Sequence, residues 1–138
     1  MKLKDLTFRG GVAVSDNKGL TKDLLIEPAE DPSMVMIALH QHTGAPCEAV
    51  VQAGDEVKVG QVIGQSQAFV SAPVHSSVSG TVKEIVSMAI PTGLTVECVV
   101  IESDGKNTMD ESIKPNGGLE DLSPEELIEI IKEAGITG

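Results

Sequence analysis

The side chains best able to do chemistry are gathered in the stretch from His40 to Cys47, which reads HQHTGAPC. His40 and His42 are two residues apart, so on a strand they would point to the same face and could form half of a metal site. Only Cys47 or the distant His75 could add a ligand, which favours ordinary histidines at the end of a strand. A nucleophilic pair of Cys47 and His42 would need close contact and an orienting acid. We therefore predict no catalytic, cofactor-binding or metal-binding residue in this chain.

A metal-binding enzyme domain that uses His40, His42 and Cys47 is kept as the less favoured alternative. The two cysteines, Cys47 and Cys98, lie in separate segments and form no CxxC pair. Iron–sulfur and structural zinc sites usually draw several thiolates from closely spaced motifs, so such a site built from this chain alone is disfavoured. An unpaired cysteine behaves as a small hydrophobic side chain. We expect both cysteines to be buried free thiols.

The composition is acidic and poor in aromatic residues. Ten lysines and arginines stand against 21 aspartates and glutamates in 138 residues, a net charge of −11, which repels nucleic acid and anionic lipid. Phe8 and Phe69 are the two aromatic residues, so platforms for stacking bases or a flavin are scarce. The N-terminus lacks the apolar stretch of a signal peptide, and no apolar run is as long as a membrane span. We expect a soluble, cytosolic domain that inserts into no membrane and binds no nucleic acid.

Residues 54–82 determine the fold, because short valine-rich runs alternate there with Gly, Pro and Ser. This spacing is typical of many short strands. Gly54-Asp55 and Gly60-Gln61 mark tight corners. Ala72-Pro73 interrupts strand pairing, because proline has no N–H, and Ser79-Gly80 opens the next strand. The segment is therefore predicted to be a small, strongly bent β structure.

Three longer apolar or alternating runs, 34–39, 81–86 and 94–102, predict further strands. Together with the bent segment they define a β domain over residues 34–104. The side chains expected to contribute to its core are Val57, Val62, Ile63, Val82, Ile85, Val99 and Ile101.

Different structures are predicted on either side of this domain. Residues 1–33 are polar and broken by Gly and Pro, which indicates an extended N-terminal arm. Residues 105–122 are a linker that contains another Pro and Gly breaker. Residues 123–138 form a C-terminal helical segment.

The C-terminal helix is predicted over residues 124–134. Ser123 and Glu126 are placed for a capping box, with Pro124 in the first turn, and Gly135 ends the helix. Its apolar residues are too many for a narrow stripe, so the helix is expected to dock on a neighbouring surface. They are Leu127, Ile128, Ile130 and Ile131.

The β domain resembles the biotinyl/lipoyl barrel-sandwich hybrid domains. GDEVKVGQ at 54–61 is similar to their first motif, and AP at 72–73 with SGTV at 79–82 to their last. The resemblance implies a mainly β, barrel-sandwich hybrid fold, here with an extended arm and one helix added. The hairpin tip, 65–70, carries no lysine, and none lies between Lys58 and Lys83. Carrier chemistry is therefore rejected, because it needs an exposed amine.

Nearly the whole chain also resembles the N-terminal region of the RnfC family, the C subunits of the Rnf electron-transport complex. The similar motifs are TFRGGV at 7–12, QHTGAP at 41–46, FVSAPVHSSVSGTV at 69–82, and LSPEELI at 122–128 followed by AGI at 134–136. The family usually has His-Pro-Pro where this chain has Ala13-Val14-Ser15.

The resemblance implies a structural and docking domain of an ion-translocating ferredoxin:NAD oxidoreductase. In that family FMN, NADH and two four-iron clusters (4Fe-4S) belong to regions that follow AGI, so we expect this chain to be a non-catalytic portion of a longer protein. The implied partners are the other subunits of a membrane-bound complex, and NADH and ferredoxin through the parent protein. The implied location is the cytoplasmic face of the cell membrane. A related soluble NADH-linked electron-transfer protein is the alternative parent.

Overall fold

The computed structural model describes residues 15–113, 118 and 122–137. The chain divides into two units, Met1–Glu30 and Asp31–Gly138. In the first unit the described residues are exposed and largely irregular, apart from one 3₁₀ turn at Lys18–Leu20. The motif at 7–12 and part of the predicted linker, 114–117 and 119–121, lie outside the described residues.

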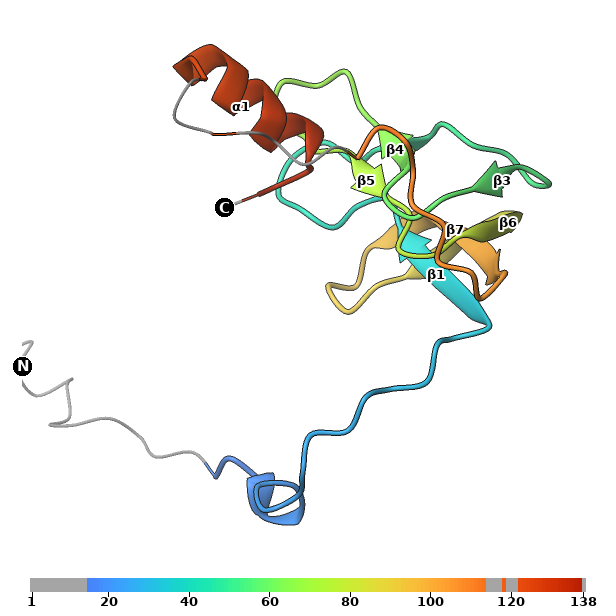
Figure 1. Cartoon of the computed structure of the whole chain (residues 1–138), viewed down its shortest axis with the longest axis vertical. Helices are drawn as coiled ribbons and strands as arrows, with labels where there is room; N and C mark the ends of the chain where they lie inside the picture. Colours follow the sequence, from blue (N-terminus) through green and yellow to red (C-terminus); the bar gives the residue numbers. More distant parts are fainter. Residues whose placement is uncertain (1–14, 114–117, 119–121, 138) are drawn as a thin grey trace, which may run out of the picture. The chain divides into compact units, whose positions relative to one another are not determined.

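The second unit contains two antiparallel sheets (Figure 1). One has the strand order β1-β7-β6-β3, and the other has the order β2-β4-β5. The strand bounds are β1 Met34–Ala38, β2 Glu48–Ala49, β3 Glu56–Val57, β4 Val62–Gln65, β5 Val74–His75, β6 Gly80–Ala89 and β7 Thr95–Ser103. The short strands lie where Gly, Pro and Ser interrupt the apolar runs, which confirms the mainly β prediction.

The β6–β7 hairpin is the longest pairing in the fold. It runs from Gly80 opposite Ser103 to Ala89 opposite Thr95, with an irregularity in register between Val82 and Glu84. On its other edge β7 pairs with β1, so it lies inside its sheet and four consecutive residues, 98–101, are buried. β1 is at the edge of that sheet, and Ile37 is its only buried residue.

The predicted corners tie the short strands to neighbouring segments, the first of them to the long hairpin. Gly54 has a φ of +95°, which a side chain would disfavour. Its N–H donates to the Val82 carbonyl, and the Val82 N–H donates to the Asp55 carbonyl, both at 2.8 Å. At the second corner the Gly60 N–H donates to the Ser76 carbonyl at 2.8 Å.

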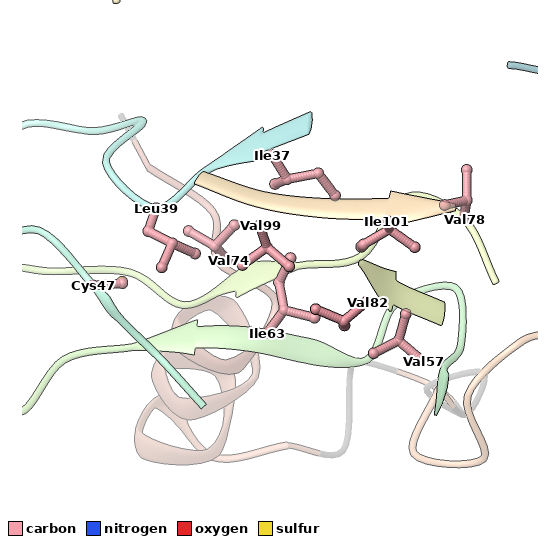
Figure 2. Close-up of a cluster of buried hydrophobic side chains, with 10 residues drawn as sticks. All are labelled: Ile37, Leu39, Cys47, Val57, Ile63, Val74, Val78, Val82, Val99 and Ile101. Carbon is pink, nitrogen blue, oxygen red and sulfur yellow. The ribbon is translucent and has the colours of Figure 1, made fainter. Parts of the chain in front are cut away.

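The core lies between the two sheets. In Figure 2, Val99 and Ile101 of β7 and Ile63 of β4 belong to one cluster of packed side chains between the two strands. Its buried members are Ile37, Leu39, Cys47, Val57, Ile63, Val74, Val78, Val82, Val99 and Ile101.

Five of the seven predicted core residues are buried, and Val62 and Ile85 are half-buried. Val62 directly precedes the fully buried Ile63 on β4, and neighbouring residues of a strand point to opposite faces. Ile85 packs against the core cluster, but it lies beyond the short pairing of β3 with β6, so less protein covers it.

The C-terminal helix, α1, spans Pro124–Glu133. Both hydrogen bonds of the predicted capping box are present, between Ser123 and Glu126. None of its residues is buried, and Ile128 and Ile131 are 64% and 48% exposed. The predicted surplus of apolar side chains is therefore confirmed. Within the described residues, no helix has the length and apolar character needed to cross a membrane.

Candidate functional site

Two loops that each contain an Ala-Pro pair lie side by side, and we call them the loop pair. The first is 41–47, between β1 and β2, and the second is 69–73, between β4 and β5. The Ala45 N–H donates to the Val70 carbonyl at 3.0 Å, and the Ser71 hydroxyl donates to the Ala45 carbonyl at 3.0 Å. The loop pair contains two of the reactive side chains singled out in the sequence, His42 and Cys47.

Gly44 allows the two loops to approach each other. Its φ is +132°, and a Cβ placed on it would collide with the backbone carbonyl oxygen of Val70 and lie 2.9 Å from Val70 Cγ1. Any side chain at position 44 would therefore push the loops apart and would also be strained in its backbone.

His42 binds the second loop through Nε2. The Ala72 N–H donates to Nε2 at 3.1 Å, and Ser71 Oγ lies 3.1 Å from the same nitrogen. A backbone N–H can only donate, so Nε2 must present its lone pair and the ring proton of the neutral imidazole lies on Nδ1. The nitrogen that would act as a base toward Cys47 or Ser71 is thus already an acceptor for the backbone.

Cys47 is 4% exposed and is a member of the core cluster. Its thiol donates to the Ala72 carbonyl at 3.1 Å, and its sulfur lies 3.7 Å from Ser71 Oγ. His42 and Cys47 therefore meet at the Ser71 hydroxyl, and within the described residues no hydrogen bond joins them directly. This geometry does not support the nucleophilic pair considered from the sequence, because the thiol proton is directed at a carbonyl.

His40 does not share a strand with His42, because β1 ends at Ala38. The two imidazole rings meet edge to face, with centroids 6.0 Å apart. Among the described residues, no three His, Cys, Asp or Glu side chains are grouped so that they could hold a metal ion. The alternation that would have placed both rings on one face of a strand thus does not extend to position 42.

His75 lies on β5, next to the end of α1. A Cβ placed on Gly135 would lie 2.6 Å from the Pro73 carbonyl oxygen and 3.3 Å from the His75 ring. His42, His75, Gly135 and Thr137 line one hollow of about 250 Å³. The end of the helix is therefore packed closely against the second loop of the loop pair.

Two further serines of the motif at 69–82, Ser76 and Ser79, form hydrogen bonds within the protein. Ser76 and Ser79 are buried. Ser76 Oγ donates to the Val78 carbonyl at 2.7 Å, and Ser79 Oγ donates to Asp104 Oδ1 at 2.6 Å. Ser79 Oγ also accepts the Thr108 N–H at 2.9 Å, so it fastens the turn after β7 to the start of β6.

Hydrogen bonds lower the pKa of three carboxyl groups. The Ser79 hydroxyl and then the Lys106 N–H hold the pKa of Asp104 below its usual value. Ser112 lowers the pKa of Asp110 in the same way, and the Ser123 N–H lowers the pKa of Glu126 in the capping box. Each bond favours the ionised carboxylate. Burial has the opposite consequence for Cys98, since it raises the pKa of the thiol and keeps it neutral.

Of the four residues considered from the sequence, the structure brings His42 and Cys47 to one hydroxyl group, that of Ser71. Ser71 was not singled out, because its partners Ala45 and His42 are 26 and 29 residues away in the chain. The one feature of the sequence that points to Ser71 is its position directly before Ala72-Pro73, since that pair indicates a loop. Both cysteines are buried free thiols, as predicted.

Known proteins share this sequence over most of its length. The sequence profile of the RnfC barrel sandwich hybrid domain matches residues 6–106. The C subunit of the Na(+)-translocating ferredoxin:NAD(+) oxidoreductase complex of Acetobacterium woodii is 42% identical over 138 residues, which are 100% of this chain and 31% of the relative. The proton-translocating counterpart of Clostridium ljungdahlii is 46% identical over 132 residues, 96% of this chain and 29% of the relative.

A more distant relative is the C subunit of the ion-translocating oxidoreductase complex of Vibrio cholerae. It is 32% identical over 133 residues, which are 95% of this chain and 17% of the relative. The chain thus spans less than a third of the length of these curated relatives. The matched profile covers the two sheets and the loop pair, so the chain belongs to the RnfC family, and its β domain is a barrel-sandwich hybrid.

Proposed function

We propose that this chain is the N-terminal structural and docking domain of an RnfC protein and performs no chemistry itself. The observation that carries the proposal is that the reactive side chains of the loop pair are engaged in hydrogen bonds to the protein's own backbone. His42, Cys47 and Ser71 each bond to a backbone group of a neighbouring loop. A catalytic nucleophile or base needs that same atom free to reach its substrate.

The cofactors of the parent protein are proposed to lie in its other regions, because this chain does not fit them. A four-iron cluster is held by four cysteine thiolates, and this chain has two cysteines, both buried. Of its two aromatic residues, Phe69 is fully exposed on the loop between β4 and β5. FMN, NADH and the clusters would then be bound by the remaining two thirds of a protein such as the Acetobacterium woodii relative.

The parent protein is proposed to pass electrons between NADH and ferredoxin at the cytoplasmic face of the cell membrane, as part of a complex with other subunits. The names of the relatives support this role, since they describe ferredoxin:NAD(+) oxidoreductase complexes that translocate ions.

Within that protein α1 is proposed to link the β domain to the nucleotide-binding region. Gly135 packs on Pro73 and His75, so the end of the helix is in contact with the second loop of the loop pair. Ile128 and Ile131 are left exposed for a neighbour to cover. Burying each of them would contribute about 1.5 to 3 kcal/mol.

Three measurements on the purified chain test the proposal that it binds no cofactor and is not catalytic. They are titration calorimetry with FMN and with NADH, an absorption spectrum, and metal analysis. We expect a colourless protein that binds neither compound. Stoichiometric flavin, zinc or iron would overturn the proposal.

Hydrogen exchange on the full-length RnfC protein tests the proposed link through α1. Slow exchange over 124–134 supports the link, and fast exchange there would show that the helix frays freely and would contradict it.

A further inference from the structure

Phe69 is an exposed aromatic side chain with no structural task in the described part of the chain. Phe69 lies in the loop between β4 and β5, and the course of this loop can be followed in Figure 1. Its side chain is completely exposed, and the adjacent Val70 is 58% exposed. Phe69 and Val70 form a pair of adjacent exposed apolar side chains, and contiguous exposed apolar surface is a mark of interaction sites. Phenylalanine is also enriched at the centres of protein interfaces.

The backbone beside Phe69 is held in place on its C-terminal side. The Val70 carbonyl accepts the Ala45 N–H, and the Ser71 hydroxyl donates to the Ala45 carbonyl, both at 3.0 Å. The next residue is bound on both sides, since the Ala72 N–H donates to His42 and its carbonyl accepts the Cys47 thiol. A side chain presented on a fixed loop loses little conformational freedom on binding, which favours affinity.

The charges near this loop indicate what kind of partner would fit. Glu129, Lys132 and Glu133 of α1 line the same hollow as Ala68 and Ser71 of the loop. Lys132 pairs with Glu129 at 3.7 Å, which leaves the Glu133 carboxylate as the excess charge. The whole chain carries a net charge of −11. Such surroundings favour a positively charged protein surface and disfavour an anionic bilayer.

We propose that Phe69 is an anchor residue that inserts into an apolar pocket with a basic rim on another protein of the complex. The proposal rests on the docking function proposed above and assigns that function to one side chain. Val70 adds apolar contact beside the ring, and the loop pair supplies the rigidity. In this proposal the hydrogen bonds of His42, Cys47 and Ser71 hold the loop that carries Phe69 in its binding position.

The test uses the complex that contains the full-length RnfC protein, purified from membranes through a tag on that protein. The variants are Phe69→Asp, Phe69→Leu and, as a matched control, Val50→Asp at a site that is 53% exposed and follows β2. The measurement is the dissociation constant between the RnfC protein and the rest of the complex. We expect Phe69→Asp to weaken binding by about tenfold or more, and Phe69→Leu and Val50→Asp to weaken it by less than about threefold.

Two further measurements identify the partner and exclude misfolding. A photoreactive p-benzoylphenylalanine at position 69 should cross-link to a peptide of another subunit, one with apolar residues flanked by Lys or Arg. The melting temperature of the 138-residue chain should be the same for Phe69→Asp and the wild type, since Phe69 makes no buried contact.

The possible failures are distinguishable. If the wild-type RnfC protein binds no other subunit, the proposed docking function is wrong. If it binds and Phe69→Asp binds as tightly as Val50→Asp, the anchor is wrong while the docking function stands. Cross-linking to lipid alone would assign the residue to the membrane surface and would also overturn the proposal.

Discussion

Replacing Gly44 with alanine should separate the two loops of the loop pair. The new Cβ would collide with the Val70 carbonyl, the oxygen that accepts the Ala45 N–H. Moving the loops apart would break this bond and the bond from Ser71 to the Ala45 carbonyl. Alanine would also have to adopt the φ of +132° that glycine has here.

The size of the effect follows from these losses. Backbone strain of this kind costs about 1 to 3 kcal/mol, and each hydrogen bond contributes about 0.5 to 1.5 kcal/mol. Gly44→Ala should therefore lower the free energy of unfolding by about 2 to 6 kcal/mol, a large share of the roughly 5 to 15 kcal/mol of a typical domain.

Gly54→Ala is the matched control. Gly54 also has a positive φ, +95°, but a Cβ there would meet nothing within 4 Å. The control therefore carries the backbone strain without the collision. Gly44→Ala should melt below Gly54→Ala by about 4 to 12 °C, taking about 4 °C per kcal/mol for a domain of this size.

The assay is thermal unfolding followed by far-UV circular dichroism, because the chain has no Trp or Tyr for fluorescence. Equal melting temperatures for the two variants would show that contact between the loops contributes nothing to stability. The stabilising role of the loop pair would then be refuted.

Two other substitutions test the core and the turn after β7. Val99→Asp should unfold the chain, because Val99 is fully buried and an unpaired buried carboxylate costs several kcal/mol; a cooperative melting transition in circular dichroism would contradict this. Ser79→Ala should flatten the acid dependence of stability. The lowered pKa of Asp104 gives a stabilisation that is present above the unfolded pKa, near 3.9, and lost as the pH falls through the lower folded pKa. Urea midpoints measured below about pH 4 should thus fall less steeply in the variant, and an unchanged slope would contradict the role of Ser79.

Local sequence patterns predicted those parts of the fold that depend on neighbouring residues. The alternation at 81–86 predicted β6, and the β-branched run at 94–102 predicted β7. Ser123 and Glu126 predicted the start of α1, because a capping box is made by residues three apart. These elements were predicted because their determining contacts lie within one strand or one helical turn.

The candidate site could be predicted only in part, because it depends on contacts between distant segments. The chemistry of their side chains is enough to single out His42 and Cys47 in the sequence. Their hydrogen-bond partners, the Ser71 hydroxyl and the Ala72 backbone, are 24 to 30 residues away. No periodic pattern pairs two loops. The same reason explains the partial exposure of Ile85, which depends on how far the distant strand β3 extends along β6.

The most direct test of the central claim, that the reactive side chains serve to bind the loops, is the tautomer of His42. Long-range ¹H–¹⁵N NMR spectra of the chain with a neutral imidazole distinguish a protonated from an unprotonated ring nitrogen. We predict an unprotonated Nε2 that accepts the Ala72 N–H, with the proton on Nδ1 and slow exchange of the Ala72 amide. A proton on Nε2, or fast exchange of that amide, would show that the ring does not hold the second loop and would contradict the claim.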